Sequence, residues 1–161
     1  MRLSIQGLGI IFYSPFAAEH IRKGEDYLNK RYLKPEDVVP HILAGTVVGF
    51  GTGSPGTFEL RFRAGYPSDD ELESHDCKLR LGLEVRDETL CVRDLYDLLR
   101  WQRRCPDGQR LTLADGYYHV TLVSSAPPSG ILGDDQVIDV YLNPLSTMPS
   151  LKYDGVPMLC E

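Results

Sequence analysis

The sequence predicts a mainly β protein of the α+β class: an antiparallel β-sandwich with one or two short helices. Short segments of alternating apolar and polar residues recur along the chain, turn residues separate them, and few stretches show helical spacing. With 161 residues, 42% of them hydrophobic and 25% charged, the chain can bury enough apolar surface to fold without disulfides or a bound metal. We therefore expect a single domain over residues 1–161.

The N-terminal segment is expected to enter the core as a strand and then turn helical. Alternation at residues 3–13 becomes a continuous apolar run, which Ser14-Pro15 ends. Residues 17–33 have irregular helical spacing, which indicates one irregular helix or two short ones. Lys34-Pro35-Glu36-Asp37 is typical of the first turn of another helix, and Pro40 is expected to keep that helix short.

The middle of the chain predicts a hairpin and a strand. Residues 46–50 and 57–63 flank the glycine-rich stretch Gly51-Thr52-Gly53-Ser54-Pro55-Gly56, as the two arms of a hairpin would. That stretch matches the GxGxxG pattern of dinucleotide sites, but a strand pattern follows it where such a site needs a helix. We therefore interpret it as a mobile hairpin loop. Residues 78–86 alternate most clearly and predict a strand with one buried face.

The second half predicts one main helix, a second hairpin and a last strand. Apolar residues at helical spacing indicate a helix over 92–103. Residues 110–113 and 117–122 are expected to pair around the turn Asp115-Gly116. A loop at 124–133 precedes a strand at 136–142, and the proline-rich tail that follows is expected to wrap the surface.

The residues that could carry chemistry show no catalytic or ligand spacing, so we expect no metal and no cofactor. Cys77, Cys91, Cys105 and Cys160 lack CxxC spacing, and reduced thiols are expected. His20, His41 and His119 are isolated. The run His75-Asp76-Cys77 could suggest a nucleophile, but the strand alternation points Cys77 inward as an inert small hydrophobe.

Charge favours a basic partner over nucleic acid. The net charge of −6 disfavours phosphate binding, which depends on clustered Lys and Arg. Two acidic groups stand out, one in an expected loop and one before the last strand: Asp69, Asp70, Glu71, Glu73 and Asp76, then Asp134 and Asp135, with Asp139 nearby. Such acids either face solvent only or imitate phosphates for a basic partner such as a nuclease. No stretch is long enough to span a membrane and no secretory signal is evident, so a cytoplasmic location is expected.

Several segments of the second half resemble a group of small bacterial proteins. They are the stretch Leu95-Tyr96-Asp97-Leu98-Leu99-Arg100-Trp101, the stretch Asp115-Gly116-Tyr117-Tyr118-His119-Val120-Thr121-Leu122, the strand Val140-Tyr141-Leu142 and the tail Met148-Pro149-Ser150-Leu151. The group contains competence-associated nuclease inhibitors and immunity proteins paired with secreted nuclease toxins. The resemblance covers residues 78–160 and implies a β-sandwich that binds one toxin in the cytosol of the producing cell, with no catalytic residue to transfer.

The leading hypothesis is thus a non-enzymatic immunity protein that inhibits a cognate secreted nuclease toxin, for example one delivered by type VI secretion. The acids of residues 69–76, with Asp134 and Asp135, are the expected contact. One alternative is a small-ligand or carbohydrate-binding β-sandwich that uses Tyr117, Tyr153 or Trp101 for stacking and the Gly51 loop as a lid. Another is a hydrolase whose site assembles from His41, His119 and Cys105.

Overall fold

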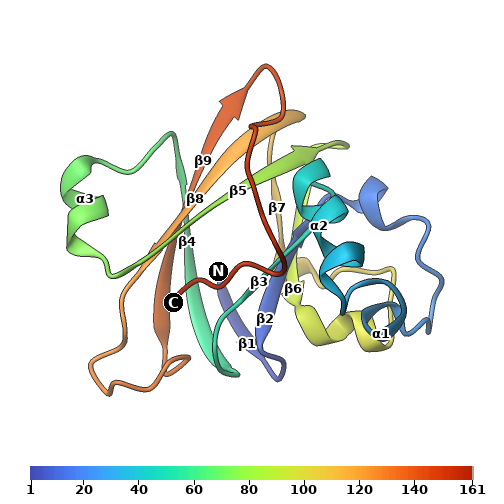
Figure 1. The fold of residues 1–161 in the computed structure, drawn as a ribbon, viewed down its shortest axis with the longest axis horizontal. Coiled ribbons are helices and arrows are strands. Elements are labelled where there is room, and N and C mark those ends of the chain that lie inside the picture. Colours follow the sequence, from blue (N-terminus) through green and yellow to red (C-terminus); the bar gives the residue numbers. More distant parts are fainter. Residues whose placement is uncertain (161) are drawn as a thin grey trace.

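Alternating strands place their apolar side chains between two sheets, which pack face to face in the computed structural model of residues 1–160 (Figure 1). The five-stranded sheet has the order β1 (Arg2–Ile5), β4 (Gly56–Ala64), β9 (Gln136–Leu145), β8 (Gly116–Ser124), β5 (Cys77–Val85). The four-stranded sheet has the order β3 (Val47–Gly51), β2 (Gly9–Tyr13), β6 (Thr89–Asp94), β7 (Arg110–Thr112). The predicted mainly β sandwich is confirmed.

One pairing departs from the expected antiparallel arrangement. β4 and β9 run parallel, with Phe58 opposite Gln136 and Ala64 opposite Leu142. All other strand pairs are antiparallel. The parallel pair places strands more than 70 residues apart in sequence side by side, and it joins the β1–β4 part of the larger sheet to the β8–β5 part.

The helices are short and lie beside or between the sheets. They are α1 (Tyr27–Arg31), α2 (Pro35–Ala44) and α3 (Asp69–Ser74), with 3-10 turns η1 (Pro15–Ala18), η2 (Leu95–Leu99) and η3 (Asp107–Gln109). Two short elements are present in residues 17–33, as expected, but they cover only residues 17–18, the end of η1, and 27–31, α1; residues 19–26 are not helical. Pro40 does not shorten α2, because Val38 and Ile42 on either side of it are buried and hold the helix, which ends at Gly45 with φ of 66°. Within residues 1–160 no helix has the length and apolarity to cross a membrane.

The predicted helix over 92–103 is wrong. Residues 89–94 form β6, which pairs with β2 and β7, and only residues 95–99 coil, as η2. The helical spacing of Val92, Leu95 and Leu99 was coincidental, because the strand is buried at four consecutive positions, Leu90 to Arg93. Asp94 ends the strand by accepting hydrogen bonds from the backbone N–H groups of Gln6 and Tyr96.

Both predicted hairpins are also wrong, because the two strands of each expected hairpin do not pair with each other. β3 and β4 belong to different sheets, and so do β7 and β8. The turn residues of 51–56 and 115–116 therefore carry the chain from one layer to the other. β7 pairs with β6 instead, with Leu90 opposite Leu111.

The glycines of the 51–56 stretch are used for a close approach between loops. Gly56 has φ of 144°, and a Cβ there would collide with the carbonyl oxygen of Gly133. The Gly133 carbonyl accepts a hydrogen bond of 2.7 Å from the Thr57 N–H. The stretch is thus a packed crossover between the two sheets, and the interpretation as a hairpin loop is wrong.

The C-terminal tail wraps the surface, as expected, and is pinned there by a disulfide. Cys77 and Cys160 are bonded, with their Cα atoms 4.6 Å apart. The expectation of reduced thiols is therefore wrong for this pair, while Cys91 and Cys105 are free and buried. The Gly51 N–H donates to the Pro157 carbonyl (2.8 Å) and the Leu159 N–H to the Gly51 carbonyl (2.9 Å), so the tail also bonds to the end of β3.

Candidate functional site

The acidic segment predicted as a loop is a short helix, α3, whose N-terminus is capped by side chains. The Ser68 hydroxyl accepts a hydrogen bond from the Glu71 N–H, and the Glu71 carboxylate accepts one from the Ser68 N–H, which is a capping box. Asp69 and Asp70 occupy the first turn, where the helix dipole favours negative charge. α3 is therefore a defined element that presents its acids in fixed positions.

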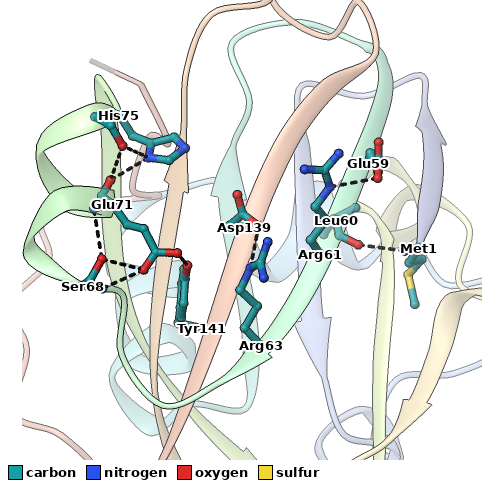
Figure 2. Close-up of polar contacts among 11 residues, drawn as sticks. Met1, Glu59, Leu60, Arg61, Arg63, Ser68, Glu71, His75, Asp139 and Tyr141 are labelled. Atoms are coloured by element: carbon teal, nitrogen blue, oxygen red, sulfur yellow. Dashed lines mark hydrogen bonds and ion pairs between the residues drawn. The ribbon is translucent and has the colours of Figure 1, made fainter.

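α3 lies on the outer face of the larger sheet, in the connection from β4 to β5 (Figures 1 and 2). The Tyr141 hydroxyl of β9 donates to the Glu71 carboxylate, and the Tyr66 hydroxyl is 3.0 Å from Nδ1 of His119 in β8. The connection thus covers the middle strands of the sheet, and Thr121 and Val123 of β8 are buried although they point outward.

Glu71 belongs to this anchoring and not to the free acidic surface. Hydrogen bonds from Tyr141 first, and then from the backbone and hydroxyl of Ser68, lower the pKa of Glu71 to about 2. Burial first, and then the same contact with Glu71, raise the pKa of Tyr141 to about 12. Of the predicted contact residues, Glu71 therefore serves to hold α3 on the sheet.

The other acids of the segment remain available. Asp69, Asp70, Glu73 and Asp76 are exposed, and none forms an ion pair within residues 1–160. Asp69 and Glu73 are four residues apart on one side of the helix, where like charges repel. Glu73 lies in the last turn, where the dipole opposes negative charge. No Lys or Arg within residues 1–160 therefore pairs with these four carboxylates.

Asp134 and Asp135 are not part of this surface. Both lie in the connection between β8 and β9, and the Asp135 carboxylate forms an ion pair of 2.6 Å with Arg2 of the edge strand β1. Asp139 is largely buried on β9 and pairs with Arg63 at 2.9 Å (Figure 2). The structure thus divides the predicted acidic set into one free group on α3 and a second group elsewhere.

The groups proposed for a hydrolase do not converge. His41 contacts Tyr27, whose hydroxyl is 2.9 Å from Nε2 of His41 and 2.9 Å from Nε2 of His20. His119 faces Tyr66, and the Cys105 thiol faces the Pro106 and Gln109 carbonyls. No group of three or more His, Cys, Asp or Glu residues within 1–160 could hold a metal ion.

The stacking residues proposed for a small ligand are mostly occupied. Trp101 is buried, with the Arg93 guanidinium 4.5 Å from its ring centre and Tyr13 against its edge. The Tyr153 hydroxyl donates to the Arg80 carbonyl, so it serves to tie the tail to β5. The Gly51 loop is bonded to the tail and to the loop at Gly133, which leaves no lid to move.

Comparison with known proteins gives a match of structure and none of sequence. No protein-family model matches the chain, and a search of curated proteins found no relative. The crystal structure of ComJ from Bacillus subtilis, an inhibitor of the DNA-degrading activity of NucA, superposes with a TM-score of 0.51 over 90% of this chain and 94% of that one, at 11% identity. This chain shares the ComJ fold.

A second solved structure supports the same assignment. The structure of crocagin biosynthetic gene J superposes with a TM-score of 0.53 and 15% identity, over 88% of this chain and 94% of that one. The resemblance expected for residues 78–160 is confirmed as a likeness of fold and extends over most of the chain. At 11% and 15% identity, the two matches establish a shared fold and not a shared function.

Sequence reasoning missed the residues that position the acidic surface. The pattern Ser68-x-x-Glu71 is a readable capping-box signal, and it would have replaced the expected loop by a helix. Tyr141 could not have been found in this way, because nothing near it in sequence reveals that a helix 70 residues earlier lies over it.

Proposed function

We propose that this chain is a non-enzymatic nuclease inhibitor, an immunity protein that binds a cognate secreted nuclease toxin and blocks its activity. The observation that carries the proposal is the fold, which resembles that of an inhibitor of a DNA-degrading activity over nearly the whole length of both chains. A folded surface with uncompensated acids fits this role, since a nuclease must present positive charge to its phosphate substrate.

The proposed contact is the α3 acidic surface, which we define as Asp69, Asp70, Glu73 and Asp76. A nuclease that approaches α3 with Lys or Arg would relieve the repulsion between these carboxylates and form charge-assisted hydrogen bonds. Before contact, the same charges would steer the encounter and raise the association rate. Glu71 stays outside the contact because Tyr141 and Ser68 already occupy its carboxylate. Asp134 and Asp135 belong to a separate group that we expect to contribute little.

The first test uses the purified chain and the purified product of the gene that neighbours its own, which the proposal expects to be a nuclease. DNA degradation by that nuclease should stop at an equimolar amount of the chain, with no change in either protein's covalent structure. If degradation continues at a tenfold excess of the chain, the proposed function is wrong.

The second test concerns α3 and compares two variants of equal charge change. The first carries Asp69→Asn, Asp70→Asn, Glu73→Gln and Asp76→Asn. The control carries Glu19→Gln, Glu36→Gln, Asp87→Asn and Asp154→Asn, all exposed and unpaired within the described residues. We expect the first variant to associate about tenfold more slowly at low salt and the control to change little, with the difference shrinking at high salt. Equal losses would assign the effect to net charge and remove α3 from the contact.

We propose that inhibition takes place in the cytoplasm of the producing cell. Cytosolic thiols are kept reduced, so the tail must there hold its position without the Cys77–Cys160 bond. Leu159 is fully buried and the tail bonds to Gly51 at two points, which supports a tail that stays docked after reduction. Inhibition measured with and without a reductant should therefore be the same.

A further inference from the structure

The large exposed apolar side chains are not scattered over the surface. Five of the eight gather around one groove of about 550 Å³, which argues against chance exposure. We call it the apolar groove and define it by these five residues: Leu8, Leu33, Tyr96, Leu99 and Met158, exposed by 51%, 62%, 42%, 37% and 38%. They come from the β1–β2 turn, the α1–α2 connection, η2 and the C-terminal tail.

The walls of the apolar groove are fixed by hydrogen bonds. Tyr32, which lines it, donates its hydroxyl to the Val47 carbonyl (2.6 Å) and accepts from the Gly49 N–H (2.8 Å). The segment before α1 is bonded to Trp101 through Gly24 and Glu25, at 2.7 and 3.0 Å. On the opposite side Met158 is held by the backbone bonds of its neighbours to Gly51. A ligand would therefore meet a preformed groove and lose little entropy in ordering it.

The surroundings of the groove are basic, in a chain whose net charge is −6. Lys34 and Arg100 directly follow the groove residues Leu33 and Leu99, and Lys30 and Arg31 lie in the last turn of α1. All four are exposed and form no ion pair within residues 1–160.

Most acids of the same segments already have partners; within residues 1–160 the exposed exceptions are Asp154 of the tail and Glu36, two residues after Lys34. Asp94 accepts from the N–H groups of Gln6, Gly7 and Tyr96, and Asp97 pairs with Arg93 at 2.8 Å. Asp26 caps α1 by accepting from Asn29. The four unpaired cations outnumber these two unpaired acids, so the net unpaired charge near the groove is positive.

The positive charge near the apolar groove indicates which kind of molecule would bind there. A second copy of the chain related by two-fold symmetry would place the groove against itself and bring the same four cations into opposition. A neutral apolar ligand would fill the groove but would form no ion pair with those cations.

We propose that the apolar groove docks an apolar segment of a partner protein that is flanked by aspartate or glutamate. Its apolar side chains would cover Leu33, Leu99 and Met158, and its acids would pair with Lys34 and Arg100. This surface is separate from α3 and of opposite charge, and the inference holds whether or not the partner is a nuclease.

The probe is a pair of labelled amphipathic peptides with the same leucine and phenylalanine stripe, one flanked by glutamate and one by lysine. Fluorescence anisotropy with the full chain should show the acidic peptide bound at least tenfold more tightly than the basic one. The double variant Leu33→Ser, Leu99→Ser should weaken the acidic peptide at least tenfold. Lys34→Glu with Arg100→Glu should remove the preference between the two peptides.

The control is Leu43→Ser with Ile131→Ser, which removes two exposed apolar side chains that do not line the groove. It should bind as the unmodified chain does, and circular dichroism should show all variants folded. Equal binding of both peptides, or binding unaffected by the groove substitutions, overturns the proposal. So does a concentration-dependent dimer in sedimentation that the groove substitutions abolish, because the occupant is then a second copy.

Discussion

The hydroxyl of Tyr141 in β9 donates a hydrogen bond to the carboxylate of Glu71 in α3, across 70 residues of sequence (Figure 2). This contact joins the helix that carries the free acids to a central strand of the larger sheet. It separates two roles within one run of acids: Glu71 fixes the helix, while Asp69, Asp70 and Glu73 face solvent.

Tyr141→Phe should loosen α3 without unfolding the sheet. The substitution removes the only donor that β9 offers to Glu71 among the described residues, and the melting temperature should fall by a few degrees. Hydrogen exchange should speed up at the α3 amides and stay unchanged in β8. Tyr117→Phe is the matched control, because no hydrogen bond of its hydroxyl is present in residues 1–160. Equal effects of the two substitutions would contradict the anchoring role of Tyr141.

Stability should fall in acid partly because of Glu71. Its pKa is lowered from the ordinary 4.5 to about 2 in the folded chain, so its contribution is fully present above about pH 4.5 and is lost as the pH falls toward 2. Thermal melts of the unmodified chain and of Glu71→Gln, taken from pH 7 to pH 2, measure this. The unmodified chain should lose stability more steeply below pH 4.5, and parallel curves would exclude Glu71 as the cause.

The Cys77–Cys160 bond should matter for stability more than for binding. It closes a loop of 83 residues, for which the chain-entropy model gives about 4.5 kcal/mol. Cys77→Ala with Cys160→Ala should lower the free energy of unfolding in urea by that order and leave the native contacts of Leu159 in place. A loss below about 1 kcal/mol would mean that the unfolded chain is already compact near the tail.

Gly56 and Gly116 offer a test of the loop contact at Gly133. Both have nearly the same φ, 144° and 143°, so alanine costs the same backbone strain at each. Only Gly56 would push a Cβ into the Gly133 carbonyl, while Gly116 faces open space. Gly56→Ala should therefore destabilise by about 1–3 kcal/mol more than Gly116→Ala in urea unfolding. Equal losses would show that the two loops can move apart freely.

Features that depend on a single strand or helix could be predicted from the sequence. Residues 78–86 alternate because one face of β5 is buried and the other is wet, and the structure has this strand almost as predicted. The start of α2 at Pro35 followed from the fixed φ of proline and the acids of its first turn. The burial of Cys77 was also correct, although its partner was not foreseen.

Pairing between strands that are distant in the sequence could not be predicted. Asp115-Gly116 has the composition of a hairpin turn, but nothing local tells whether the next strand returns to the same sheet or crosses to the other. The helical spacing of residues 92–99 was outweighed by strand pairing with β2, which lies about 80 residues earlier. Of the candidate site, sequence located the free acids of α3 but not the apolar groove, since its five residues come from four separate segments.

The parallel pairing of β4 with β9 also bears on synthesis of the chain. β9 is the last strand to leave the ribosome, and until it does, the open edges of β4 and β8 have no partner within the larger sheet. A nascent polypeptide exposes the β4 edge while residues 65–135 are made, whereas the β8 edge waits only for residues 125–135, so the β4 edge is the longer exposed site for aggregation.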